Sequence, residues 1–237
     1  MVNDDVLAFA QRRKILVVAP HPDDETLGCG GFISLSAQTG SAVYVVFVTN
    51  GAASHRKSKA WPPARLAAQR EREACHALAC LGLENAPRLF LRLTDANMPM
   101  PEDPAWRNAV AAVGDILQRF APDLVILPWR RDPHCDHRGS WLLAQHALKQ
   151  VSLRPEILEY AVWLDEFGEA GDRPDSDEVE LVRVHIDGVL ERKRAAVAAH
   201  LSQTTGLIAD DPDGFRLTPQ TIARLTQSTE IYFRPLQ

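Results

Sequence analysis

The sequence predicts an α/β protein: a single domain with a Rossmann-like, doubly wound and mostly parallel sheet and helices on both faces. Short apolar runs alternate with longer segments of helical spacing, the pattern of successive strand–helix units. Two of the runs, residues 15–19 and 123–128, lack polar alternation, as do strands that are covered on both faces. The chain has 237 residues, which is enough for one large α/β core.

The first half of the chain contains three predicted strands and two predicted helices. Residues 15–19 (ILVVA) form a buried strand that stops at Pro20. Asp24 or Thr26 can cap a helix that continues to about residue 38. The remaining elements of this half are a strand at 42–48, an amphipathic helix at 64–81 and a strand at 88–93.

The second half continues the alternation and adds two polar loops. The predicted elements are a helix at 106–120, a strand at 123–128, a helix at 140–151, a strand at 157–163, a half-exposed edge strand at 180–185 and a helix at 189–201. The polar stretch 52–63 and the acidic stretch 168–177 are predicted loops that could shape a site. The last segment, which includes residues 218–224, yields no clear element.

Composition excludes several classes of partner. The formal net charge is −5 and the basic residues are scattered, so we predict no nucleic-acid partner. No apolar run has the length of a membrane span, and residues 1–14 place acids before bases, the reverse of a secretory signal. Four cysteines without a CxxC pair indicate neither a disulfide framework nor a thiol zinc site. These features predict a cytoplasmic protein with a small-molecule partner and no membrane partner.

Two clusters of histidine and aspartate follow the strands at 15–19 and 123–128. The clusters are His21, Asp23 and Asp24, and His134, Asp136 and His137. In a sheet of order 3-2-1-4-5 these two strands are neighbours, and ligands bind at the carboxyl edge where the strand order reverses. We therefore expect the two clusters to meet at this edge.

Two imidazoles and one carboxylate form a common ligand set for a catalytic zinc ion, and His21, Asp24 and His137 are the set we predict. Asp23 then remains free to accept a proton, and His134 to stabilise an oxyanion or protonate a leaving group. Asp136 could fix the tautomer of His134. The set predicts metal-assisted hydrolysis of an amide, although iron(II) or another divalent ion also suits these ligands.

Other interpretations of the same residues remain open. A single histidine after a strand is usually structural, and Asp24 could simply cap a helix. Gly28, Gly30 and Gly31 could suggest a phosphate loop, but GCGG matches neither common phosphate motif, and close helix packing explains these glycines better. Cys29 and Cys135 are interpreted as ordinary packing thiols.

Motifs at both clusters resemble one known family. AHPDDE at 19–25 (APHPDDE here) and HxDH at 134–137 are similar to motifs of the LmbE-like/PIG-L superfamily of zinc-dependent N-acetylglucosaminyl deacetylases. Weaker similarities are the RxxE of Arg70 and Glu73, LRLTDANMP, EYAVW and KRAAVAAHLSQ. The resemblance covers nearly the whole chain, so residues 1–237 are expected to form one LmbE-like deacetylase domain.

The resemblance implies a role for each matching residue. His21, Asp24 and His137 match zinc ligands, Asp23 matches the general base, and His134, supported by Asp136, matches the residue that stabilises the tetrahedral intermediate. Arg70 matches a substrate-contacting arginine, whereas without the family it would be an exposed partner of Glu73. His200 and Gln203 lie in the tail segment that resembles the family and could approach the site. The alternative for His200 is a position at a solvent-facing helix end. Cys135 replaces the proline usual in HxDH, so the turn at His134 departs from the family pattern.

The expected function is therefore a zinc hydrolase that removes an acyl group, above all acetyl, from the nitrogen of an amino sugar or related small molecule. An amidase of the same metal chemistry, acting on a thiol conjugate or on a larger acyl group, is one alternative. A non-catalytic sugar- or nucleotide-binding module on a Rossmann-like sheet is the other.

Overall fold

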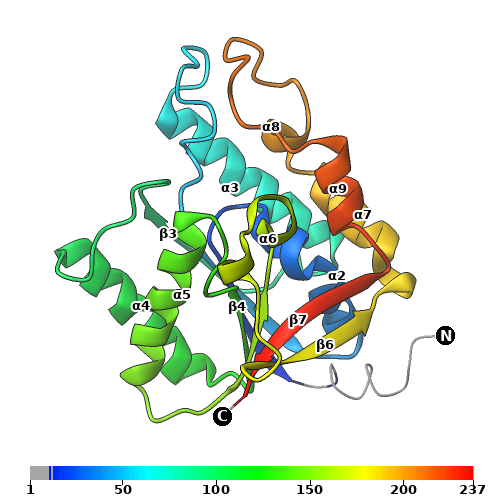
Figure 1. The fold of residues 1–237 in the computed structure, drawn as a ribbon. Coiled ribbons are helices and arrows are strands. Elements are labelled where there is room, and N and C mark those ends of the chain that lie inside the picture. Colours follow the sequence, from blue (N-terminus) through cyan, green and yellow to red (C-terminus); the bar gives the residue numbers. More distant parts are fainter. Residues whose placement is uncertain (1–10, 12, 237) are drawn as a thin grey trace.

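A computed structural model describes residue 11 and residues 13–236, so the prediction about residues 1–14 falls largely outside the described part. Within that part the strands form one seven-stranded sheet of order β3-β2-β1-β4-β5-β7-β6 (Figure 1). The strands are β1 (Lys14–Ala19), β2 (Ala42–Thr49), β3 (Arg88–Leu93), β4 (Leu124–Pro128), β5 (Glu156–Tyr160), β6 (Val179–His185) and β7 (Thr229–Pro235). The doubly wound, mostly parallel sheet that the sequence predicted is confirmed.

The centre of the sheet is the pair formed by β1 and β4. Strand β1 pairs in parallel with β2 on one side and with β4 on the other. The order 3-2-1-4-5 is therefore present, and its reversal lies between β1 and β4. Within the described sheet, β7 runs opposite to the other strands, since it pairs in antiparallel fashion with both β5 and β6. The carboxyl ends of β1 and β4 thus meet at one edge of the sheet.

Helices cover both faces of this sheet (Figure 1). They are α2 (Asp24–Gln38), α3 (Pro63–Cys80), α4 (Pro104–Phe120), α5 (Cys135–Lys149), α6 (Leu164–Phe167), α7 (Leu190–Ala198), α8 (Leu201–Thr204) and α9 (Pro219–Leu225), with short 3₁₀ turns η1 (Ala170–Asp172) and η2 (Asp187–Val189). Alternate side chains of β1 enter opposite cores. Val17 packs with residues of α2, α3 and α7, whereas Val18 packs with residues of α4 and α5. Both side chains are fully buried, which explains the unbroken apolar run. No helix in the described part of the chain combines the length and apolar character that crossing a membrane requires.

Helix α2 is kinked at Cys29, and a buried charge pair supports the kink. Cys29 has non-helical backbone angles, and the N–H groups of Gly31 and Phe32 donate to the carboxylate of Glu230 on β7. Lys193 of α7 donates to the same carboxylate at 2.6 Å, and both side chains are almost fully buried. Because each charged group is paired and hydrogen-bonded, the cost of burying it is offset. The network fixes α2, which begins directly at the functional cluster.

One strand was not predicted, and two predicted helices have other bounds in the structure. Strand β7 was missed because its place between β5 and β6 depends on tertiary pairing, which the local pattern does not reveal. Helix α5 begins at Cys135 and not at residue 140, because the imidazole of His134 accepts a hydrogen bond from the N–H of Asp136 and acts as the helix cap. The helix predicted at 189–201 is divided, since α7 ends at Ala198 and α8 starts at Leu201.

Gly28 of α2 is expected to be essential for packing against β5. A Cβ atom at this position would lie 2.1 Å from Cδ2 of the buried Tyr160, so Gly28→Ala should lower the free energy of unfolding by about 1–3 kcal/mol. Gly114→Ala is the matched control, because a Cβ atom there meets nothing within 4 Å and alanine favours the helix interior. Urea unfolding measures both variants. Equal stability of Gly28→Ala and the wild type would contradict the packing described here.

Candidate active site

The turn between β1 and α2 places His21 and Asp24 in direct contact. The backbone N–H of His21 donates to Oδ2 of Asp24 at 2.9 Å, and the Nδ1 atom of the His21 ring lies 3.0 Å from the same oxygen. Asp24 is the first residue of α2 and is almost fully buried. Its carboxylate also benefits from the positive end of the helix dipole.

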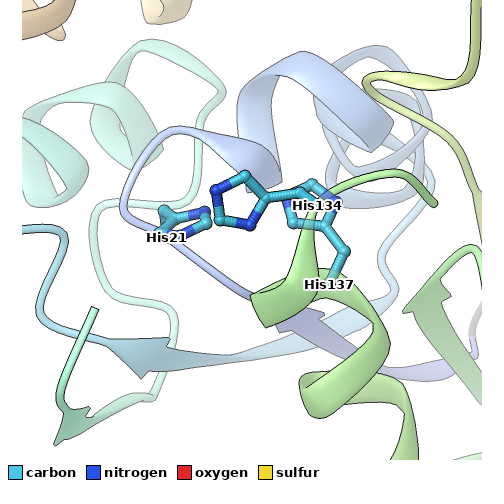
Figure 2. Close-up of side chains that lie close together, drawn as sticks. All are labelled: His21, His134 and His137. Carbon is cyan, nitrogen blue, oxygen red and sulfur yellow. The ribbon is translucent and has the colours of Figure 1, made fainter. Parts of the chain in front are cut away.

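The turn between β4 and α5 brings His137 to the same carboxylate. Nε2 of His137 lies 3.2 Å from Oδ2 of Asp24, and the ring centroids of His21 and His137 are 5.5 Å apart. Figure 2 shows these two imidazoles gathered with that of His134, although 113 residues separate His21 from His134 along the chain. The structure therefore brings the two predicted clusters together across the β1–β4 reversal.

Further carboxylates hold the outer nitrogens of these two rings. Nδ1 of His137 faces Oδ1 of the fully buried Asp132 at 3.3 Å. Nε2 of His21 lies 3.2 Å from Oδ1 of Asp95 and 3.1 Å from Oδ2 of Asp136. Sequence analysis assigned no role to Asp132 or Asp95. Their positions just beyond β4 and β3, at the same sheet edge as the clusters, are the signal that could have identified them.

The protonation of this group reflects its acidic surroundings. Burial lowers the pKa of His137, but Asp24 and Asp132 outweigh burial and raise it to about 9. Burial likewise lowers the pKa of His21, yet its hydrogen bonds to Asp136, Asp24 and Asp95 raise it well above the ordinary value. Burial raises the pKa of Asp24, but His137 and His21 hold it well below the usual range. The site thus concentrates buried negative charge that requires compensation by cations.

The donor set formed by His21, Asp24 and His137 fits a divalent metal ion. Neither ring nitrogen of His137 makes a well-formed hydrogen bond among the described residues, although each faces a carboxylate oxygen. A buried imidazole in that position is suited to sharing a cation with Asp24, while Asp132 orients its other nitrogen. Other side chains could also contribute, since the groups His21–His134–His137, His134–Cys135–Asp136 and His21–Asp95–Asp136 each have ligand atoms within 4.8 Å of one another.

Asp23 is held beside this group by a buried arginine. Nη2 of Arg70 lies 2.9 Å from Oδ2 of Asp23 and also donates to the carbonyl oxygen of Pro22 at 2.9 Å. Burial raises the pKa of Asp23 to about 6 although Arg70 lowers it. Arg70 is only 3% exposed, so the alternative of an exposed partner for Glu73 is wrong. Glu73 instead accepts hydrogen bonds from the backbone N–H and hydroxyl of Ser202.

His134 has a defined tautomer. Its Nδ1 accepts a hydrogen bond from the backbone N–H of Asp136 at 3.2 Å, and burial together with the neighbouring His21 and His137 lowers its pKa to about 4. The ring is therefore neutral at pH 7 and carries its proton on Nε2. Asp136 was predicted to fix the tautomer of His134, and the contact is made by its backbone N–H; its carboxylate faces His21 and accepts from the N–H of Ala96.

The two cysteines near the clusters differ in environment. Cys29 is buried within α2, as expected of a packing thiol. Cys135 is exposed, so its interpretation as a packing thiol was wrong. It occupies the first turn of α5 beside the cap at His134, where the neighbouring side chains do not enclose it.

The tail segment also reaches the site. His200 is fully buried, and its Nε2 atom lies 3.2 Å from Oε1 of Glu25, so the alternative of a solvent-facing helix end is wrong. The other oxygen of Glu25 accepts from the backbone N–H of Asp23 at 2.9 Å, which connects His200 indirectly to Asp23. Gln203 lies on the wall of the cavity described next.

A cavity of about 510 Å³ opens over these groups. Its polar wall includes His21, Asp23, Asp24, Arg70, Asp95 and His134, and its other walls include Ala53, Ser54, Trp163, Phe167 and Phe215. The volume lies within the range of about 300–1,000 Å³ that is common for small-molecule sites. Asp23 and His134 face this cavity together with His21 and Asp24, whereas His137 is fully buried behind them.

Residues 16–148 match the sequence profile of the PIG-L family, described as GlcNAc-PI de-N-acetylase. The match spans more than half of the chain and contains both histidine–aspartate clusters. The chain belongs to the PIG-L family. This PIG-L protein is thus an enzyme of a hydrolase family whose named activity is the removal of an acetyl group from nitrogen.

Individual relatives agree with this assignment. The 1D-myo-inositol 2-acetamido-2-deoxy-alpha-D-glucopyranoside deacetylase of Rhodococcus jostii is 29% identical over 81% of this chain and 82% of its own. The structure of N,N'-diacetylchitobiose deacetylase from Pyrococcus horikoshii has a TM-score of 0.67 and 23% identity, and covers 96% of this chain and 85% of that one.

The same fold also supports different chemistry. GalB, the 4-carboxy-2-hydroxymuconate hydratase of Pseudomonas putida KT2440, has a TM-score of 0.68 and 19% identity, and covers 95% of this chain and 96% of its own. Fold likeness alone therefore does not determine the reaction of this PIG-L protein, which must be inferred from its site.

Asp132 is predicted to set the metal affinity through His137. Asp132→Asn keeps one acceptor oxygen for the N–H groups of Val162 and Trp163 but removes the charge that faces His137. We expect zinc affinity, measured by competition with a chromophoric chelator, to fall about 10- to 100-fold. The exposed Asp165→Asn is the control and should leave it unchanged. Wild-type affinity in Asp132→Asn would exclude this role.

Proposed function

We propose that this PIG-L protein is a zinc-dependent deacetylase that removes an N-acyl group, above all N-acetyl, from an amino sugar or related small molecule. The observation that supports this proposal best is the position of Asp24 Oδ2, which lies 3.0 Å from His21 Nδ1 and 3.2 Å from His137 Nε2. Asp23 and His134 flank this arrangement in the same cavity and remain available for proton transfer.

His21, Asp24 and His137 would hold the metal, and Asp132, Asp95 and Asp136 would orient the two rings. A zinc ion bound there would act as a Lewis acid on the amide carbonyl and lower the pKa of a water molecule toward about 7. A carboxylate is the preferred proton acceptor beside such a water, and Asp23 is the one that lines the cavity without contacting either ligand ring.

Asp23 would act as the general base. Arg70 holds its carboxylate in place, and a pKa of about 6 leaves most of the carboxylate ionised at pH 7 while keeping it basic enough to accept a proton. The water oxygen then bonds to the carbonyl carbon. Asp23 returns the proton to the amide nitrogen as the carbon–nitrogen bond breaks, which yields a carboxylic acid and a free amine.

His134 would stabilise the negative charge that develops on the carbonyl oxygen. Since the N–H of Asp136 occupies its Nδ1, the neutral ring offers its Nε2 proton to the cavity. A neutral donor suffices for this purpose. We assign a neutral His134 to this role, because burial and the neighbouring imidazoles lower its pKa to about 4.

A panel of N-acetylated substrates tests the substrate class. The two relatives described above are named for an acetylated glucosamine of inositol and for diacetylchitobiose. Incubation of the zinc-loaded protein with N-acetylated mono- and disaccharides, followed by mass spectrometry, should show loss of acetyl and gain of a free amine. Loss of acetyl from none of these compounds would contradict the proposed function.

Substitutions should separate the metal ligands from the base. Asp24→Ala and His137→Ala are expected to lose both bound zinc and activity, because each removes a proposed ligand. Asp23→Asn should retain zinc while kcat falls by about 10² or more. Metal content by plasma emission spectroscopy and steady-state kinetics measure the two properties. Full turnover by Asp23→Asn would exclude it as the base.

Arg70→Ala should mainly lower kcat, because the guanidinium of Arg70 holds the carboxylate of the proposed base. It also donates hydrogen bonds to two backbone carbonyl groups. We expect a decrease of about tenfold or more with unchanged zinc content. The exposed Arg72→Ala, on the same helix, is the control. A rise in KM at unchanged kcat would instead support the substrate contact that the family resemblance implied.

A further inference from the structure

Three aromatic side chains line the same cavity as the histidine–aspartate group. Trp163 lies at the centre, with ring centroids 5.7 Å from Phe167 and 5.7 Å from Phe215. The ring of Phe215 meets that of Trp163 at 86°, an edge-to-face contact. We call these three residues the aromatic wall. None of them has a part in the proposed reaction.

The segments that carry the aromatic wall are anchored. Glu166, next to Phe167, accepts hydrogen bonds from Thr221 and Arg224 of α9. The backbone N–H of Phe215 donates to the carbonyl oxygen of Ser54 at 2.7 Å. These bonds join the aromatic wall to the loop after β2 and to α9. Backbone and neighbouring side-chain contacts therefore hold the rings in place at the cavity.

Close packing fixes the Phe215 segment further. A Cβ atom at Gly214 would lie 2.2 Å from the ring of the buried His55, so only glycine allows this approach. The carboxylates of Asp210 and Asp211 also accept N–H groups of the loop after β2, from Lys59 and Lys57. These contacts join the two loops, which lie above α3 and α8 in Figure 1.

Exposure within the aromatic wall increases toward solvent. Trp163 is 9% exposed, whereas Phe215 is 41% and Phe167 is 65% exposed. Single exposed apolar side chains are ordinary, but two phenylalanines on either side of one tryptophan at a cavity form a contiguous apolar surface of the kind that binds ligands. Arg56, which is exposed, lies on the same cavity without a polar partner among the described residues.

We propose that the aromatic wall is a subsite for an apolar aglycone of the substrate, an aryl or alkyl group attached to the acylated sugar. The proposal rests on the proposed function, because the reacting amide must lie against Asp23 and His134 at the polar wall. The remainder of the substrate then extends toward the two phenylalanines. An aromatic or alkyl group there would cover their exposed faces and gain hydrophobic and ring-contact energy.

The aglycone, rather than the acyl group, is the occupant that the comparisons favour. The relatives are named for N-acetyl compounds, in which the acyl group is small and the variable part lies on the other side of the amide. A methyl group cannot span a cavity of about 510 Å³, so the larger side of the substrate must fill it.

Paired glycosides test the subsite. With the zinc-loaded protein, the phenyl glycoside of N-acetylglucosamine should show a higher kcat/KM than the methyl glycoside. Phe167→Ala and Phe215→Ala should each lower kcat/KM for the phenyl glycoside by roughly three- to tenfold and leave that for the methyl glycoside within about twofold. The control Leu181→Ala, an exposed apolar residue on β6, should change neither.

Three results would overturn the subsite. One is equal kcat/KM for the two glycosides in the wild type. Another is an equal loss for both glycosides in the phenylalanine variants, since this indicates a structural role. The third is a preference for the N-benzoyl over the N-acetyl form of the methyl glycoside that disappears in the same variants, because the wall then holds the acyl group.

Calorimetry measures the binding of the two glycosides, so this test of the subsite does not depend on turnover. If the protein deacetylates neither glycoside nor any compound of the substrate panel described above, the proposed function fails. Tighter binding of the phenyl than of the methyl glycoside, with loss of the difference in Phe167→Ala and Phe215→Ala, would still support the subsite. Equal binding of both glycosides would refute it.

Discussion

The contact of one carboxylate oxygen with two imidazoles, Asp24 Oδ2 between His21 and His137, is the constraint on which the site depends. It requires the ends of β1 and β4 to be adjacent, which the order of the sheet provides. It also requires α2 to begin at Asp24 with a fixed orientation. Glu230, paired with the buried Lys193, accepts the N–H groups at the kink of α2 and so helps to maintain that orientation.

Charge balance explains why so many acids surround two histidines. Asp24, Asp95, Asp132 and Asp136 approach the rings of His21 and His137, and their negative charge raises the pKa of both imidazoles despite burial. Protons supply the balancing charge when no metal is bound. A divalent ion bound as proposed would supply the same two charges once the rings gave up those protons, so metal binding would be coupled to proton release. The same acids would then orient the ligands.

The sequence allowed prediction of the parallel sheet and of the meeting of the two clusters, because both follow from strand order and from side chains at strand ends. The positions of Asp132 and Asp95 after their strands could have placed them at the site, but the ring that each carboxylate contacts could not be predicted, since this depends on how turns from separate strands pack. The cap of α5 by His134 was missed because histidine is not a usual capping residue. The burial of His200 could not be predicted, because it depends on the division between α7 and α8.

Anomalous diffraction at the zinc absorption edge tests the central claim most directly. Crystals of the zinc-loaded protein should contain one strong anomalous peak about 2.0–2.2 Å from a ring nitrogen of His21, a ring nitrogen of His137 and a carboxylate oxygen of Asp24. A peak held instead by His134, Cys135 and Asp136, or the absence of any peak between His21 and His137, would contradict this account.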